Sequence, residues 1–86
     1  YVVSGHYDSR NADVGDGTRL APGAVDDASG TAVALEACRV LSERSFPATI
    51  LFVAYDAEEQ GLLGSQAHAA QLAAAGARVD GMITCD

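Results

Sequence analysis

Three acidic residues follow an apolar run in this sequence of 86 residues. Asp56, Glu58 and Glu59 come directly after residues 48–55, which read Ala-Thr-Ile-Leu-Phe-Val-Ala-Tyr. Such a run is typical of a strand that is covered on both faces. Carboxylates at the end of a buried strand are costly unless something pairs with them. Because carboxylate oxygens are good ligands for divalent cations, we expect a metal ion to be that partner.

Further candidate ligands lie where two other strand-like segments, residues 1–5 and 81–85, come to an end: His6, Asp8 and Asp86. A fourth candidate, Asp26, belongs with Asp27 to a polar, glycine-rich segment. In parallel α/β sheets, ligands bind beyond the carboxyl ends of the strands. If the segment with Asp26 folds back over that edge, one rim collects all of these side chains.

The elements that must position these residues follow from the pattern of apolar residues. Strands are predicted at residues 1–5, 48–55 and 81–85, and a long loop at residues 6–29. A helix is predicted at residues 29–44, and a second, alanine-rich helix at about residues 63–75. This alternation predicts an α/β fold in which helices flank a parallel sheet and the crossovers are right-handed.

The first predicted helix has an apolar stripe that we expect to face the sheet: Val33, Ala37, Val40 and Leu41. Ser29 is its expected N-cap, and Pro47 is expected to stop it. The second helix is expected to close at Gly76. Its histidine, His68, is expected to be a surface residue.

Composition excludes several classes of partner. The chain has 12 acidic and 5 basic residues, no lysine and a net charge of −7. This balance argues against nucleic acid or an anionic membrane as a partner. No apolar run approaches the length of a membrane span. Both ends of the chain fall within strand-like runs, so we expect it to be part of a larger domain.

Four segments together resemble a known family. They are His6-Tyr7-Asp8-Ser9, residues 21–30 (Ala-Pro-Gly-Ala-Val-Asp-Asp-Ala-Ser-Gly), residues 57–65 (Ala-Glu-Glu-Gln-Gly-Leu-Leu-Gly-Ser) and a strand that ends in Asp86. In order and spacing they resemble the M28 family of zinc metallopeptidases over essentially the whole chain. The resemblance implies a three-layer α/β/α fold of the zinc-exopeptidase type, with a mostly parallel sheet, of which residues 1–86 form an incomplete part of the catalytic domain.

The same resemblance implies a site with two zinc ions. His6 and Asp86 would bind one zinc, Glu59 would bind the other, and Asp26 would bridge both. A further histidine ligand is expected after Asp86, so we expect the 86 residues alone to be inactive.

The remaining roles that the resemblance implies concern catalysis. Glu58 would be the general base that takes a proton from water between the metals. Asp8 would accept the free imidazole N–H of His6 and so fix its orientation. A cis peptide bond is expected between Asp26 and Asp27.

The activity implied is that of a metal-dependent exopeptidase, first of all an aminopeptidase that acts on the N-termini of peptides or proteins. A related zinc hydrolase, similar to a carboxypeptidase, a dipeptidase or a glutaminyl cyclase, is an alternative. A receptor-like domain that keeps the fold without the chemistry is another. Because the family is often exported, the resemblance implies a secreted or periplasmic protein.

Simpler interpretations of the same residues stay open at this point. Glu58 and Glu59 could form a solvated turn, which is the commonest use of paired charges in loops. Asp26 and Asp27 could form a turn and a cap before the helix. His6 alone could be a hydrogen-bonded structural residue.

Overall fold

The computed structural model describes residues 1–13 and 15–86. Residue 14, within the predicted loop 6–29, lies outside the described residues. The elements follow one another as strand β1 (Val2–His6), kinked turn η1 (Ala24–Ser29), helix α1 (Gly30–Leu41), strand β2 (Leu51–Tyr55), helix α2 (Leu63–Ala74) and strand β3 (Met82–Thr84). The predicted order of strands and helices is confirmed. Strands β2 and β3 and helix α1 are shorter than predicted, and β1 is shifted by one residue.

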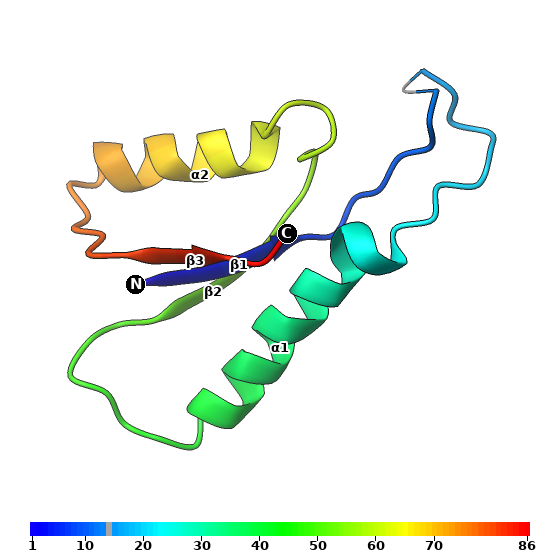
Figure 1. Cartoon of the computed structure of the whole chain (residues 1–86). Helices are drawn as coiled ribbons and strands as arrows, with labels where there is room; N and C mark the ends of the chain where they lie inside the picture. Colours follow the sequence, from blue (N-terminus) through cyan, green and yellow to red (C-terminus); the bar gives the residue numbers. More distant parts are fainter. Residues whose placement is uncertain (14) are drawn as a thin grey trace.

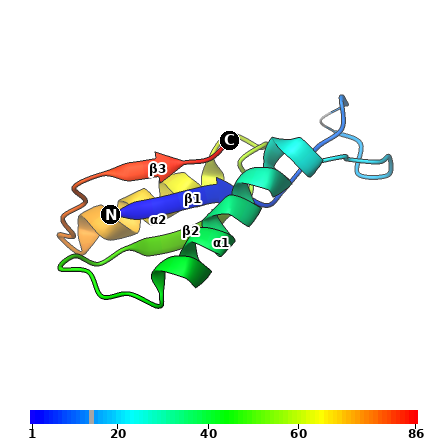
Figure 2. The same cartoon turned by 60° about the horizontal axis from the view of Figure 1, so that its bottom comes forward.

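The three strands form one parallel sheet in the order β2-β1-β3. Val2 pairs with both Leu51 and Met82, and His6 pairs with Tyr55. Helix α1 covers one face of the sheet and helix α2 lies over the other, as Figure 1 shows. Figure 2 shows the carboxyl ends of the strands at the same edge. The predicted α/β/α arrangement with a parallel sheet is therefore confirmed.

Helix α1 packs on β1 and β2 through its smallest residues. Gly30 and Ala34 are buried, and on β1 a Cβ atom at Gly5 would lie 2.7 Å from the backbone nitrogen of Thr31. The helix and the strand are thus too close for a side chain at Gly5. Small residues at this contact allow the start of α1 to lie against the end of β1.

The predicted inward face of α1 is wrong in two positions. Val33 and Val40 are 54% and 41% exposed, whereas Ala37 and Leu41 are half-buried as predicted. The buried residue in mid-helix is Ala34, which is 4% exposed. An alanine permits a closer approach than a valine, so the helix turns its small residues inward.

Helix α2 has no fully buried residue. It lies over an open cavity of 510 Å³ whose lining includes Val2, Leu72 and Met82. A hydrogen bond of 2.8 Å between the Tyr55 hydroxyl and Nδ1 of His68 crosses from β2 to α2. His68 is therefore half-buried and bonded, and the prediction of a surface residue is wrong.

The end of α2 agrees with the sequence pattern. Gly76 follows the helix with a φ of +63°, which is the left-handed conformation that favours glycine. None of the helices in the described part of the chain is long and apolar enough to cross a membrane.

Candidate metal centre

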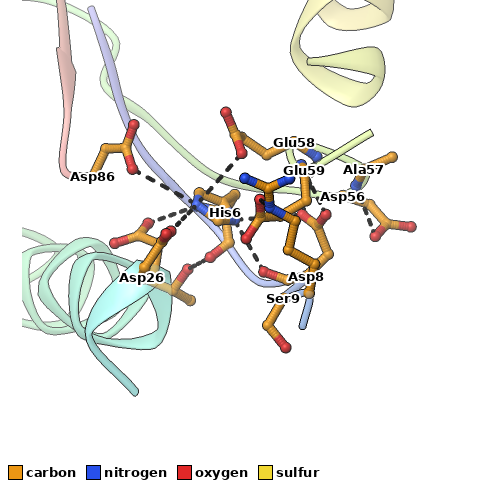
Figure 3. Close-up of polar contacts among 12 residues, drawn as sticks. His6, Asp8, Ser9, Asp26, Asp56, Ala57, Glu58, Glu59 and Asp86 are labelled. Atoms are coloured by element: carbon orange, nitrogen blue, oxygen red, sulfur yellow. Dashed lines mark hydrogen bonds and ion pairs between the residues drawn. The ribbon is translucent and has the colours of Figure 1, made fainter. Parts of the chain in front are cut away.

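His6 is held by both of its backbone groups at the end of β1. Its N–H donates to Oδ2 of Asp27 at 2.8 Å, and its carbonyl accepts a hydrogen bond of 2.7 Å from the Thr31 hydroxyl. The side chain is only 4% exposed. The ring therefore leaves the strand from a fixed backbone, and it points to the edge where the strands end (Figure 3).

The ring of His6 is oriented by Asp8. Its Nδ1 lies 3.0 Å from the backbone carbonyl oxygen of Asp8 and 3.4 Å from Oδ1 of the same residue. Because a carbonyl oxygen can only accept, Nδ1 carries a proton and Nε2 faces the acidic cluster. The sequence predicted that Asp8 orients the ring through its carboxylate, but the closer partner is its carbonyl.

The carboxylate of Asp8 also accepts two backbone hydrogen bonds. Oδ1 and Oδ2 accept the backbone N–H groups of Glu58 and Glu59 at 3.0 and 3.1 Å. Burial by itself would raise the pKa of Asp8, but these two hydrogen bonds, a third to its own backbone N–H and the charge of His6 together outweigh it, and the pKa is lowered. Asp8 therefore stays ionised and ties the end of β2 to the end of β1.

Three donor atoms of the predicted ligands converge. Nε2 of His6 lies 3.2 Å from Oδ1 of Asp26 and 3.7 Å from Oδ1 of Asp86. Ligand atoms of all three residues lie within 4.8 Å of one another. One imidazole nitrogen with carboxylate oxygens is a donor set that suits zinc. The residues present thus fit one ion of the site that the resemblance implies.

Glu58 points into the same group, as Figure 3 shows. Its Oε2 lies 3.8 Å from Nε2 of His6. Burial by itself lowers the pKa of His6, but the carbonyl of Asp8 and the charges of Glu58, Asp27 and Asp8 outweigh it, so the pKa is raised. The raised pKa shows that the surrounding charges favour a cation at this position.

The adjacent residues Asp26 and Asp27 have different roles. Asp26 turns its carboxylate out, with 69% of the side chain exposed, whereas Asp27 is only 1% exposed. The peptide bond between them is cis, as the resemblance implied. Oδ1 of Asp27 accepts the N–H of Gly30 at 2.9 Å, so Asp27 caps α1. The predicted N-cap, Ser29, instead donates its hydroxyl to the carbonyl of Val25.

Glu59 stands apart from the three converging ligands. Its side chain is 9% exposed, and its Oε2 lies 2.6 Å from Nε of Arg10. Within residues 1–13 and 15–86, the group of close metal-ligating atoms comprises His6, Asp26 and Asp86 without Glu59.

Sequence reasoning missed several residues that support the site. Thr31 and Gly5 fix the contact between β1 and α1, and Gly30 has no room for a side chain, because its Cβ atom would lie 2.6 Å from the carbonyl oxygen of Cys85. In the sequence, Arg10 counted only toward the total of five basic residues. Gly5 directly precedes His6, and Gly30 closes the segment that contains Asp26, so their positions in the sequence could have indicated a close contact. No residue near Arg10 in the sequence indicated that its partner is Glu59.

The comparisons with known proteins agree with this geometry. The sequence model of a family described as "Peptidase family M28" matches residues 1–86. A probable zinc metalloprotease of Leptosphaeria maculans is 51% identical over the whole chain, which covers 20% of that relative. Probable zinc metalloproteases of Pyrenophora tritici-repentis and Pyricularia oryzae are each 50% identical over the whole chain, which covers 18% and 17% of them.

The chain thus spans about a fifth of the length of these relatives. No solved structure matches it significantly. The match to the family model extends over every residue from the first strand to Asp86. On this ground, the chain belongs to peptidase family M28.

Proposed function

We propose that the protein that contains this chain is a zinc metallopeptidase, and that it removes N-terminal residues from peptides with the help of two zinc ions. The observation that carries the proposal is the convergence of His6, Asp26 and Asp86, with the carboxylate of Glu58 at 3.8 Å from the same imidazole nitrogen. Family membership and the zinc metalloprotease names of the relatives support it.

The proposed ligands divide between two ions. His6, Asp26 and Asp86 would hold the first, and Asp26 together with Glu59 would hold the other. When bound, zinc supplies a Lewis acid that polarises the scissile carbonyl and lowers the pKa of water. The positions of the protein ligands are maintained by hydrogen bonds that the carboxylates of Asp8 and Asp27 accept from backbone N–H groups.

Glu58 acts as the general base in this proposal. Its backbone N–H is fixed by Asp8, and its carboxylate faces the cluster with 29% of the side chain exposed. A carboxylate so placed can take a proton from the attacking water and pass it to the leaving amine. Asp8 acts as a positioning residue, because it contacts Nδ1 of His6 and the backbone N–H groups of both glutamates rather than the donor atoms that converge.

Preference for a free N-terminus follows from charge. The chain carries a net charge of −7, and two zinc ions would offset four of these charges, so the surroundings of the site would stay acidic with both ions bound. An acidic rim attracts a protonated α-amine and repels a free C-terminal carboxylate. A free α-amine is therefore the substrate feature that this rim favours. Export of the protein, which the family suggests, belongs to the proposal and can be tested by cell fractionation.

The test uses the full-length protein. Zinc content is measured with hydrolysis of an aminoacyl anilide and of its N-acetylated form, before chelation, after chelation and after zinc is restored. We expect two zinc ions per chain and cleavage of the free form alone, lost on chelation and restored by zinc. Preferred cleavage of N-blocked or C-terminal substrates would favour a related hydrolase, and formation of a cyclic N-terminus would favour a cyclase. Absence of bound zinc and of cleavage would favour a receptor-like domain.

The role of Glu58 is tested by Glu58→Gln, with Glu43→Gln as the matched control. Glu43 is exposed beyond the end of α1. We expect Glu58→Gln to keep both zinc ions and to lose turnover by about 10²- to 10⁴-fold, the usual contribution of a general base. The control should keep its turnover. Turnover near wild type in Glu58→Gln would refute the assigned role.

A further inference from the structure

Arg10 and Glu59 form an ion pair that differs from the others in this chain. Nε of Arg10 lies 2.6 Å from Oε2 of Glu59, and the side chains are 51% and 9% exposed. The other arginine pairs within the described residues join neighbours in the sequence, and their carboxylates are more exposed: Arg19 with Asp16, Arg39 with Glu36 and Arg78 with Asp80. Arg10 is thus the arginine that pairs with a distant and nearly buried carboxylate.

A nearly buried carboxylate needs compensation, since isolated charges are costly to remove from water. Glu59 receives it from one short segment. Oδ2 of Asp8 accepts its backbone N–H at 3.1 Å, and Arg10, two residues later, holds its side chain. The segment therefore fixes both the main chain and the carboxylate of Glu59.

The closest contact of the ion pair involves one carboxylate oxygen. Oε2 of Glu59 is the oxygen that lies 2.6 Å from Nε of Arg10. In the described part of the chain, Oε1 takes part in none of the hydrogen bonds. A monodentate carboxylate ligand needs one oxygen for the metal, and hydrogen bonds on the other oxygen commonly orient it.

We propose that Arg10 is a positioning residue for the second metal ion, because its guanidinium holds Oε2 of Glu59 so that Oε1 stays available as a ligand. The inference rests on the proposed function, in which Glu59 is a ligand of the second zinc. Arg10 acts through Glu59 and does not contact the converging ligands His6, Asp26 and Asp86.

The opposite role would have the opposite consequence. If the guanidinium occupied the place of the second cation, it would compete with zinc for Glu59, and removal of Arg10 would strengthen binding. The partly exposed position of Arg10 favours the positioning role, because a side chain that is 51% exposed is not enclosed among the metal ligands.

The experiment compares zinc affinities by chelator competition in the full-length protein. The variants are Arg10→Ala and Arg10→Lys, with Arg19→Ala as the matched control. Arg19 belongs to the same loop, and its Nε lies 2.9 Å from Oδ2 of Asp16. In Arg10→Ala we expect the second zinc to bind about 10- to 100-fold more weakly, the usual effect of losing a partner of a metal ligand.

The first zinc should keep its affinity in Arg10→Ala, and this also reports that the site is folded. Arg10→Lys should restore part of the loss, because lysine supplies the charge without the planar fork of donors. Arg19→Ala should bind both ions as the wild type does. In the cobalt-substituted protein, Arg10→Ala should alter the visible absorption of the second site alone.

Unchanged or tighter binding of the second zinc in Arg10→Ala would overturn the inference. A Glu59→Gln variant separates this result from a failure of the proposed function. If Glu59→Gln loses the second zinc and Arg10→Ala does not, only the role of Arg10 is refuted. If Glu59→Gln keeps both ions, the proposed ligand set is wrong, and the inference falls with it.

Discussion

Removal of the Asp27 carboxylate should destabilise the protein more than any exposed acidic substitution. Asp27 is 1% exposed, and it accepts the N–H groups of His6 at 2.8 Å and of Gly30 at 2.9 Å. Both donors are buried. Asp27→Ala leaves each without an acceptor, at roughly 1–3 kcal/mol apiece, so the free energy of unfolding should fall by about 2–6 kcal/mol.

The assay is urea unfolding of the full-length protein, combined with hydrogen exchange in peptides that cover residues 1–10 and 24–34. Exchange should accelerate at both donors, because the carboxylate joins the end of β1 to the start of α1. Asp27→Asn keeps one acceptor oxygen, so its destabilisation should be smaller.

The matched control is Asp56→Ala. Oδ1 of Asp56 also accepts a backbone N–H, that of Ala57 at 2.9 Å, but the bond is exposed. Water can replace this acceptor, so the control should lie within about 0.5 kcal/mol of wild type. If Asp27→Ala were as mild as the control, with unchanged exchange at His6 and Gly30, the account of this junction would be refuted.

Two further substitutions test the packing of the layers. Gly30→Ala should lower the free energy of unfolding by about 1–3 kcal/mol, because its Cβ atom would lie 2.6 Å from the carbonyl oxygen of Cys85. Gly17 has open space around it, so Gly17→Ala should be close to neutral in the same urea titration. Tyr55→Phe should cost about 0.5–1.5 kcal/mol through loss of the 2.8 Å hydrogen bond to His68. Thermal unfolding at full zinc occupancy would measure this loss of stability. An unchanged unfolding midpoint would show that the hydrogen bond does not stabilise the packing of α2.

The order of elements and the site edge could be predicted from the sequence because both follow from rules of topology. A buried apolar run between two helical patterns indicates a parallel sheet, and a parallel sheet brings its carboxyl ends to one edge. His6 ends β1 and Asp86 follows the neighbouring strand β3, so their proximity needed no knowledge of side-chain conformations. Asp26 joins them through a loop whose path only the resemblance suggested.

Details of contact could not be predicted in the same way. Hydrophobic periodicity considers only the polarity of side chains, and by polarity Val33 is expected on the face of α1 that packs on the sheet. The distance between the helix and β1 is set by volume, and it admits Gly30 and Ala34 instead. His68 was misjudged for a related reason, since its partner Tyr55 comes from another element and no spacing along α2 reveals it.

The division of charge around the site explains why acidic residues can gather there at all. Asp8 and Asp27 each accept two backbone N–H groups, so their charges are stabilised within the fold. In the described part of the chain, the remaining cluster carboxylates form ion pairs with the imidazole of His6 and with no arginine: Asp26, Glu58 and Asp86. A single imidazole cannot offset three negative charges held within 4 Å of one nitrogen. The fold therefore compensates the carboxylates that position the site and leaves uncompensated those that face its centre, which is the arrangement that a divalent cation requires.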